Sequence, residues 1–465
     1  KGLMKRTPEI ADIWFDSGCV PFASYYYPRR NKKEIDQEII YPADFIIEGI
    51  DQTRGWFYTL LVISTLIKNK APYKSVISNG FVLDAQGKKM SKSLGNVVDP
   101  YEIVLKYGSD LPRFYMFYLN DTYENKRFNE KELIDLKREF FDLLLNILKF
   151  YLFYYNPEVR NYKNKKELTT MDLWFSARIK ETYETYYNLM QKFEIHKASR
   201  LLFDLLSDFS RWWLRRSRER FQNFSNKKQL LNDLVIFQDF LYEFIKMLAP
   251  LAPFISEFVF QEIKDDLRVR YPVKESIHLE KLGKPIKLTL KEKLLLDEME
   301  KIRKIASDVH RIRKEKKIKL RQPLKTLYLS SKYSPEVLEI LKEEINVLEI
   351  KTEEPKQKEN LYYSEEFEKL WLDLTIDEKL KELGIYKDFI RIIQDLRQDA
   401  GLTPKEIVGL NLTLPKFLEK IVNKYLKNIT EKTKTKLVKK QKTIIAEKET
   451  DYENFGKIKL VLFKI

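Results

Sequence analysis

The sequence predicts a multidomain protein in which an α/β region is followed by an α-helical bundle and then by a small α+β appendage. Up to about residue 120, short β-branched runs such as ADFIIEG and KSVISNGFVLD alternate with the apolar helical segment GWFYTLLVISTLIKN, as in a sheet with crossover helices. From about 129 to 265, apolar residues recur at helical spacing over long segments with short connections, which is typical of an antiparallel bundle.

We expect domain boundaries near 122 and 285, which gives domains of residues 1–122, 123–285 and 286–465. In the last domain, helices are predicted near 291–316, 334–349 and 387–400, with strands at KTLYLS, IVGLNLTL and KIKLVLFKI. A helix followed by a strand recurs there, in RKIASDVHRIRKEKKIKLRQPLKTLYLS and IRIIQDLRQDAGLTPKEIVGLNLTL. The sequence leaves open whether this repeated helix–strand pattern is a duplication.

Composition narrows the classes of partner and compartment. Lys and Arg number 85 against 69 Asp and Glu, a formal charge of +16, which favours polyanions such as nucleic acid. One cysteine and three dispersed histidines exclude a disulfide framework and predict no metal site. No apolar run approaches the roughly 20 residues of a membrane span, so we expect a cytoplasmic protein. We also expect a monomer. Because the first residue is Lys1 rather than methionine, what precedes it stays open.

A lysine-rich loop, GKKMSKSLGN at Gly87–Asn96, follows the apolar run FVLD. The order FVLD, AQG, KKMSK predicts two extended runs joined by a turn that contains glycine. Lys89–Ser93 would then lie just beyond this turn, on a loop that is free to move. Two ammonium groups, Lys89 and Lys92, beside serine hydroxyls suit an array of phosphate oxygens. The alternative is a solvated basic turn.

Two acidic residues, Glu48 and Asp51, lie between the strand-like IIEG and the helix-like TRGWF. Ligands of doubly wound sheets bind at the carboxyl ends of the strands, and two carboxylates there suit a cationic amine and a ribose diol. The alternative is that Asp51 only caps the following helix.

An arginine stripe is predicted on one helix of the bundle, opposite its apolar side. Its members recur at i, i+4 and i+7 or at i and i+4: Arg211, Arg215 and Arg218, and Arg216 with Arg220. Phosphate contacts along an RNA backbone would explain the stripe without base specificity. The alternative is a solvated face partly paired to Asp208 and Glu219.

Several of these stretches resemble one enzyme family. KMSKS at Lys89–Ser93, followed by LGN, resembles the signature loop of class I aminoacyl-tRNA synthetases. DIWFDSG at Asp12–Gly18 and EGIDQTRGWF at Glu48–Phe57 resemble the isoleucyl enzymes rather than the valyl or leucyl ones. The resemblance continues through YGSDLPRFYM, WWLRRSRERF, LAPLAPFISE and KLRQPL, and it is strongest up to about Phe260.

The resemblance implies a fold and a reaction. The first domain would be the second half of a class I Rossmann-type catalytic domain, the bundle an anticodon-binding domain, and the appendage a tRNA-associated region. Such an enzyme uses ATP with Mg2+ to convert isoleucine to isoleucyl-adenylate and transfers the aminoacyl group to the 3′ end of tRNA(Ile). The family's editing domain would precede Lys1.

The resemblance also implies roles for single residues. Glu48, Gly49, Asp51 and Gln52 would bind the adenylate. Lys89, Met90, Ser91, Lys92 and Ser93 would bind the ATP phosphates, with Lys89 and Lys92 in the catalytic role. Trp14 and Trp56 would line the pocket for the isoleucine side chain.

Two alternatives stay open. One is a valyl-type paralogue. The other is a tRNA-binding fragment without activity, because the HIGH-like signature of the family occurs nowhere in these 465 residues.

Overall fold

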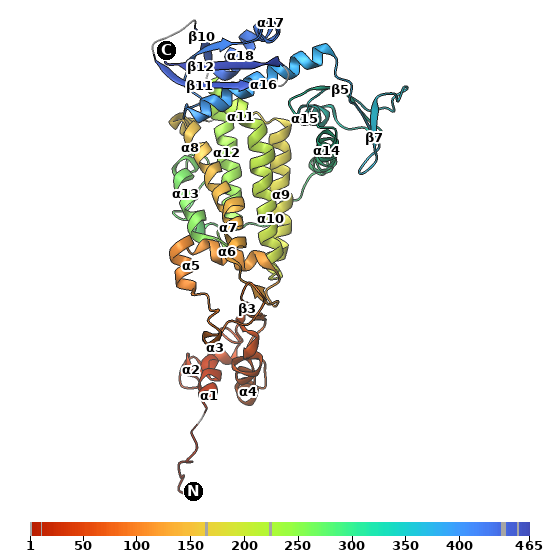
Figure 1. The fold of residues 1–465 in the computed structure, drawn as a ribbon. Coiled ribbons are helices and arrows are strands. Elements are labelled where there is room, and N and C mark those ends of the chain that lie inside the picture. Colours follow the sequence, from red (N-terminus) through yellow and green to blue (C-terminus); the bar gives the residue numbers. More distant parts are fainter. Residues whose placement is uncertain (1, 11, 163–165, 223–225, 439–442, 453–454) are drawn as a thin grey trace. The chain divides into compact units, whose positions relative to one another are not determined.

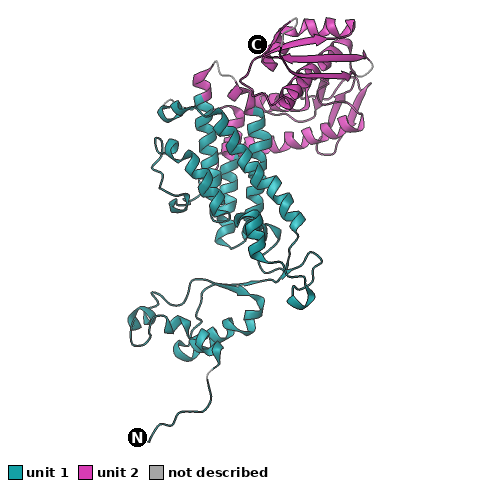
Figure 2. Ribbon diagram, turned by 60° about the vertical axis from the view of Figure 1, so that its left-hand side comes forward, with its two compact units in different colours: residues 1–166, 178–216, 231–287 teal, residues 167–177, 217–230, 288–465 magenta. Residues whose placement is uncertain are grey.

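A computed structural model describes residues 2–10, 12–162, 166–222, 226–438, 443–452 and 455–465 (Figure 1). The chain divides into two compact units (Figure 2). Unit 1 comprises residues 1–166, 178–216 and 231–287, and unit 2 comprises residues 167–177, 217–230 and 288–465. Each unit is described by itself below.

The N-terminal part of unit 1 contains a small parallel sheet. Strand β1 (Ile46–Gly49) pairs in parallel with β2 (Val76–Asn79), and α4 (Trp56–Lys68) is the crossover helix between them. Strand β3 (Val82–Leu83) pairs in parallel with β4 (Lys126–Arg127). The other elements are α1 (Ile13–Gly18), α2 (Val20–Ala23), α3 (Lys32–Asp36), η1 (Ile50–Arg54), η2 (Lys92–Leu94), α5 (Pro100–Tyr107) and α6 (Asp110–Leu119). The predicted α/β pattern is confirmed.

Helices make up the middle of the chain, as predicted. They are α7 (Glu130–Leu136), η3 (Lys137–Phe141), α8 (Asp142–Tyr154), η4 (Pro157–Asn161), α9 (Thr170–Gln191), α10 (Ile195–Asp208), η5 (Phe209–Leu214), α11 (Arg215–Gln222), α12 (Lys227–Leu248), α13 (Pro253–Leu267) and η6 (Ile277–Leu279). Buried aromatic rings pack between them: Trp213 contacts Phe237 and Phe240 edge-on, with ring centroids 5.4 and 5.1 Å apart. Such pairs add to the stability that burial alone provides.

The helix that carries the arginine stripe is not regular. Residues Phe209–Leu214 form a π turn, in which each hydrogen bond spans one residue more than in an α-helix. Four residues are therefore less than a full turn between Arg211 and Arg215. The prediction of a single α-helical stripe through Arg211 is wrong in this respect.

Two four-stranded sheets with helices form the C-terminal part of unit 2. The first has α14 (Leu290–Glu315), β5 (Leu324–Leu329), α15 (Pro335–Ile345), β6 (Val347–Lys351), β7 (Leu361–Ser364) and β8 (Leu370–Asp373). The second has α16 (Glu378–Asp399), β9 (Val408–Thr413), α17 (Lys416–Lys424), α18 (Leu426–Thr433), β10 (Thr435–Leu437), β11 (Ile444–Asp451) and β12 (Lys457–Phe463). The predicted α+β appendage is confirmed.

Two predicted helix boundaries in this part are wrong. The helix expected at 334–349 ends at Ile345, because Asn346 adopts a left-handed conformation (φ 54°) that stops a helix and that asparagine tolerates. The helix expected from 387 begins instead at Glu378, where the Asp377 carboxylate accepts a hydrogen bond from Leu380 N at 2.8 Å. Within the described residues, no helix is long and apolar enough to cross a membrane.

Candidate active site

The carboxyl end of β1 leads directly into the acidic segment. A Cβ atom on Gly49 would lie 2.6 Å from Asp51 Oδ1, so a side chain at this position would displace that carboxylate. Asp51 Oδ2 accepts a hydrogen bond from Gln52 Nε2 at 3.0 Å, and the Glu48 and Asp51 side chains are exposed. The caps of η1 and α4 are Gly49 and Gly55, so the alternative that Asp51 is a helix cap is wrong.

The structure brings the two tryptophans together with Gln52. Gln52 Oε1 accepts a hydrogen bond from Trp56 N at 3.0 Å, and Trp56 Nε1 donates to Ser17 O at 3.1 Å. A Cβ atom on Gly55 would lie 2.7 Å from Gln52 Oε1 and 3.4 Å from Trp14 Cη2. The blocks DIWFDSG and DQTRGWF, 30 or more residues apart in sequence, therefore form one wall beside the acidic segment.

Two polar residues at the end of β2, Ser78 and Asn79, lie at the candidate site, although the sequence analysis did not predict them there. The parallel register places Ser78 opposite Glu48 and Asn79 opposite Gly49. The Ser78 hydroxyl is buried and has no hydrogen-bond partner in the described part of the chain. A signal was present, since polar residues that end a second β-branched run, as in VISN, share the sheet edge with those that end the first.

The lysine loop is a hairpin, as predicted. Gly87 has φ 80° and donates to Asp84 O at 2.9 Å, while Asp84 N donates to Lys88 O at 2.9 Å. Leu83 and Lys89 form an isolated antiparallel bridge between the two arms of the hairpin. A positive φ at the turn explains why glycine stands there.

The Asp84 carboxylate, which the sequence analysis missed, holds the loop together from inside. It accepts hydrogen bonds from Lys88 N at 2.7 Å, Gln86 N at 3.0 Å and Asn96 Nδ2 at 2.8 Å. Asn96 Oδ1 in turn accepts from Ser91 N at 2.9 Å. The Asn96 amide, followed by the Lys88 N–H, lowers the pKa of Asp84 below its usual range. The signal for it was an aspartate three residues before the turn glycine.

The two lysines with a predicted catalytic role differ in their surroundings. Lys89 Nζ lies 4.6 Å from the centroid of the Phe81 ring, a cation–π contact. Lys92 begins η2 and is exposed, and its side chain has no ion pair with any described residue. The hydroxyls of Ser91 and Ser93 are 3.1 Å apart. Lys92 is thus available to a ligand, whereas Lys89 would first leave the ring.

Beneath the loop lies an apolar cavity of about 530 Å³. Its lining includes Val82, Met90, Val98, Ile103, Met116 and Phe128. Met90 is the one apolar member of the KMSKS sequence, and it lines this cavity together with the other apolar side chains, a position that suits a flexible thioether.

Replacing Asp84 by alanine should loosen the loop with little effect on the fold. Amide hydrogen exchange at Gln86 and Lys88 should rise, because both N–H groups lose their acceptor. In the parent chain the same protection should fall as the pH drops through the folded pKa of Asp84, since the ionised carboxylate is the acceptor and its pKa is lowered by these contacts. Asn96→Ala, which removes one of the three contacts, is the intermediate control. Unchanged exchange in Asp84→Ala would contradict this role.

Arg220 is held by a buried carboxylate. Its Nη1 and Nη2 donate to Asp172 Oδ2 and Oδ1, each at 2.9 Å, and Asp172 is fully buried. Burial raises the pKa of Asp172, but the hydrogen bonds and charge of Arg220 outweigh it, so the pKa lies below its usual range. This pair positions Arg220 within the fold.

The other members of the predicted stripe are more accessible. Arg211, Arg215 and Arg218 are exposed and Arg216 is half-buried. Arg215 Nε donates to the Arg211 carbonyl at 2.8 Å, and its guanidinium lies 6.0 Å from the Trp212 ring centroid. Their contact with RNA stays a prediction.

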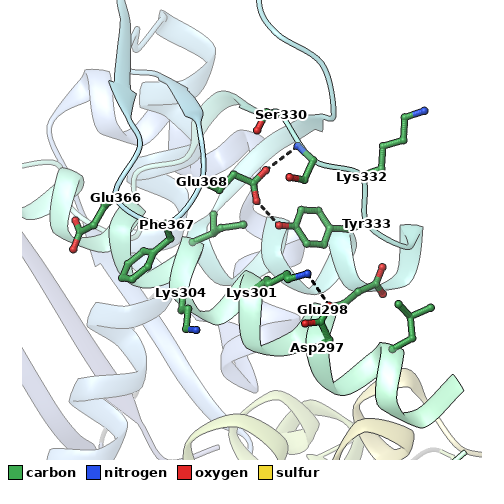
Figure 3. Close-up of a pocket in the computed structure, with 13 residues that line it drawn as sticks. Asp297, Glu298, Lys301, Lys304, Ser330, Lys332, Tyr333, Glu366, Phe367 and Glu368 are labelled. Atoms are coloured by element: carbon green, nitrogen blue, oxygen red, sulfur yellow. Dashed lines mark hydrogen bonds and ion pairs between the residues drawn. The ribbon is translucent and has the colours of Figure 1, made fainter. Parts of the chain in front are cut away.

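A second cavity, of about 610 Å³, lies in unit 2 (Figure 3). Glu368 accepts hydrogen bonds there from Ser331 N at 2.9 Å and from the Tyr333 hydroxyl, and Lys301 pairs with Asp297 at 2.7 Å. Both acidic and basic side chains line its wall. Nothing in the sequence analysis predicted this cavity.

Comparisons with known proteins match two segments of the chain. Residues 1–129 match the model of tRNA synthetases class I (I, L, M and V), and residues 172–328 match the anticodon-binding domain of tRNA ligase. Residues 1–129 are therefore a segment of a class I tRNA synthetase, and residues 172–328 are an anticodon-binding domain of the tRNA-ligase type.

Within that class, relatives of the chain include isoleucine–tRNA ligases. One from Bacillus thuringiensis (strain Al Hakam) is 36% identical over 333 residues, and one from Bacteroides fragilis (strain ATCC 25285) is 35% identical over 372 residues. These alignments cover 70% and 75% of the chain but 31% of each relative. The chain thus spans about a third of the length of the curated relatives that it matches.

Among solved structures, the chain is similar to the leucyl enzyme in the ternary complex of Agrobacterium radiobacter K84 agnB2 LeuRS, tRNA and LeuAMS. The identity is 17% and the TM-score 0.46, with 63% of this chain and 34% of that chain covered.

Proposed function

We propose that these residues are part of an isoleucine–tRNA ligase, which activates isoleucine with ATP and transfers it to the 3′ end of tRNA(Ile). The observation that carries the proposal is the wall of Trp14, Gln52 and Trp56 beside the exposed carboxylates of Glu48 and Asp51. That wall and the KMSKS hairpin belong to one chain whose relatives are isoleucine–tRNA ligases.

In this proposal each group has a distinct task. Glu48 and Gln52 bind the aminoacyl part of the adenylate, Asp51 binds the ribose, and Gly49 lets the backbone approach the ligand. Trp14 and Trp56 enclose the isoleucine side chain. The exposure of both acidic side chains supports these roles, because a carboxylate already paired inside the fold could not bind a substrate amine or diol.

The lysine loop acts on the phosphates. The carboxylate of isoleucine attacks the α-phosphorus of ATP, the bond to the bridging oxygen breaks, and pyrophosphate leaves. Lys92, with Lys89 beside it, stabilises the charge that develops on the leaving group, which is electrostatic catalysis without a protein nucleophile. Met90 anchors the loop, and Ser91 and Ser93 offer hydroxyls to the phosphate oxygens.

Mg2+ would be bound mainly by the nucleotide. No cluster of three or more His, Cys, Asp or Glu side chains that could hold a metal ion occurs among the described residues. Mg2+ in nucleotide sites is commonly held by substrate phosphates with few protein ligands. When bound, it neutralises phosphate charge. We further propose that the enzyme acts as a monomer in the cytoplasm.

For tRNA, we propose a division into a catalytic part (1–122), an anticodon-binding bundle (123–285) and a tRNA-associated region (286–465). The segment 172–328, which matches an anticodon-binding domain, contains all five arginines of the bundle helix: Arg211, Arg215, Arg216, Arg218 and Arg220. In this proposal the exposed ones contact phosphates directly, and Arg220 orders the helix through Asp172.

Charge reversal at Arg215 and Arg218 tests this surface. Arg215→Glu with Arg218→Glu should weaken tRNA binding and reduce the slope of log affinity against log salt by roughly 1 to 2, since fewer counterions are released. Fluorescence anisotropy with labelled tRNA at several salt concentrations measures both quantities. Equal slopes in variant and parent would return the arginines to a merely solvated face.

Isoleucine-dependent and valine-dependent exchange of pyrophosphate into ATP, measured side by side on the complete gene product, tests the function. The proposal predicts a much larger kcat/KM for isoleucine. A preference for valine would favour a valyl-type paralogue. Exchange with neither amino acid, together with tRNA binding, would favour a tRNA-binding protein without activity.

A further inference from the structure

Residues 290–373 and 378–463, here called the first and second modules, have the same topology. The sheet orders are β6-β5-β8-β7 and β10-β9-β12-β11. In each module the first strand is parallel to the second and antiparallel to the fourth, and the third strand is antiparallel to the fourth. A long helix precedes each first strand, and one or two shorter helices connect it to the second (Figure 1).

A buried arginine occupies the same place in both modules. Arg313 and Arg397 each donate to main-chain carbonyls six and nine residues further along the chain, at 2.8 to 3.2 Å. Each also donates to the carbonyl of the left-handed residue before the second strand, Asn346 at 3.0 Å and Lys434 at 3.3 Å. In both modules the first strand begins eleven residues after the arginine.

Arg313 and Arg397 are 84 residues apart in sequence. The buried side chains of α14 match those of α16 at the same offset. The matching pairs of buried or nearly buried apolar side chains are Leu296 and Leu380, Ile302 and Tyr386, Ile305 and Phe389, Val309 and Ile393, and Ile312 and Leu396. An unbroken offset through helix, turn and strand is unexpected for two unrelated modules. The helix–strand pattern that recurs in the sequence is therefore part of a structural duplication.

The two copies have opposite charge on corresponding elements. From the start of α15 to the end of β6, residues 335–351 contain five glutamates and two lysines. From the start of α17 to the end of β10, residues 416–437 contain seven lysines and two glutamates. Six of these lysines are exposed and have no ion pair with any described residue: Lys416, Lys420, Lys427, Lys432, Lys434 and Lys436.

An aromatic ring accompanies the lysines. Phe417, half exposed, stacks on Phe455 with ring centroids 5.2 Å apart. Phe417 follows β9, and Phe455 lies between β11 and β12. In the first module, the segments at the same places, after β5 and between β7 and β8, line the cavity of Figure 3 instead. A basic face with an accessible ring fits a nucleic-acid backbone with an unpaired base, and the acidic excess of residues 335–351 makes the corresponding segment of the first module unsuited to that contact.

We propose that the second module binds the sugar–phosphate backbone of RNA through α17, α18 and β10, and that the first module is a copy without this surface. The proposal deepens the tRNA-associated region (286–465) of the proposed function, and it rests on that function in naming tRNA as the RNA. Electrostatic contact of this kind makes the affinity fall steeply with salt.

A triple variant of the 465-residue chain tests the surface: Lys416→Glu, Lys420→Glu and Lys427→Glu. Its control is a triple variant of exposed lysines in the first module with the same change of charge: Lys332→Glu, Lys356→Glu and Lys358→Glu. A third variant, with glutamine at 416, 420 and 427, avoids repulsion between new acidic groups. Circular dichroism and thermal unfolding verify that each variant folds.

The probes are labelled tRNA and vesicles of phosphatidylserine with phosphatidylcholine. For tRNA at 0.1 M salt, we expect the second-module variant to lose about tenfold or more in affinity and its salt slope to fall by roughly 2, with the glutamine variant between it and the parent. The control should lose less than about threefold.

Equal losses in the test and control variants would overturn this inference while leaving the proposed function intact. A loss confined to vesicle binding would also overturn it, in favour of a lipid surface. The opposite outcome is also distinguishable. If the second-module variant selectively loses tRNA affinity but the complete gene product shows no isoleucine-dependent exchange, the proposed function is overturned and the RNA-binding surface of the second module is confirmed.

Discussion

Replacing Asp172 by alanine should lower the free energy of unfolding by about 3–5 kcal/mol, the cost typical of removing one partner from a buried ion pair. Asp172 is fully buried and accepts both Arg220 hydrogen bonds at 2.9 Å, and it also accepts from Thr169 N and Thr169 Oγ1 at 2.9 and 2.7 Å. Without the carboxylate, the guanidinium is desolvated and loses its bidentate acceptor. Urea unfolding followed by tryptophan fluorescence measures the change.

The same substitution at an exposed ion pair is the matched control. Asp297 pairs with Lys301 at 2.7 Å, and both side chains are 55% exposed. Asp297→Ala should cost less than about 1 kcal/mol, because solvent and salt screen such pairs. Similar losses for Asp172→Ala and Asp297→Ala would show that the buried pair contributes no more than a surface one.

Replacing Lys92 by alanine should slow adenylate formation in the complete gene product by roughly 10²–10³-fold, which corresponds to about 3–4 kcal/mol. Lys92 is exposed on the hairpin without an ion pair to any described residue, so its charge is available when pyrophosphate leaves. Rapid-quench measurement of adenylate formation reports the rate. Isoleucine affinity should change little, because the ammonium acts on the phosphates.

Lys88 is the matched control, as a lysine on the same loop whose backbone N–H, not its side chain, contacts Asp84. Lys88→Ala should retain adenylate formation within about tenfold of the parent, since it removes a neighbouring charge without removing the group aimed at the phosphates. Equal losses in the two variants would mean that the loop needs positive charge in general. An unchanged rate in Lys92→Ala would remove this residue from the catalytic role.

Sequence reasoning succeeded where local signals and long-range contacts coincided. The glycine turn and flanking apolar runs predicted the lysine hairpin, and the β-branched runs predicted β1 and β2. It failed where the partner lies far away in sequence. Arg220 fits a surface stripe by spacing alone, but Asp172, 48 residues earlier, takes up both its terminal nitrogens. Helical spacing also cannot reveal the π turn at Phe209–Leu214.

The duplication shows a different limit. Matching core positions keep their apolar character while changing identity, as Val309 and Ile393 do, and the segment from α15 to β6 is acidic where the segment from α17 to β10 is basic. Sequence comparison of the copies is therefore weak. The buried arginines Arg313 and Arg397 keep their identity because each satisfies several main-chain carbonyls, a task that needs a guanidinium.

Isoleucine-dependent exchange of pyrophosphate into ATP by the purified 465-residue chain, measured beside the complete gene product, tests the central claim most directly. We hold that these residues supply the lysine loop, one wall of the adenylate site and the tRNA-binding part, while ATP binding also needs the HIGH-like segment that they do not contain. The predicted result is tRNA binding by the chain without exchange, and strong isoleucine-dependent exchange by the complete product. Robust exchange by the chain alone would contradict this account.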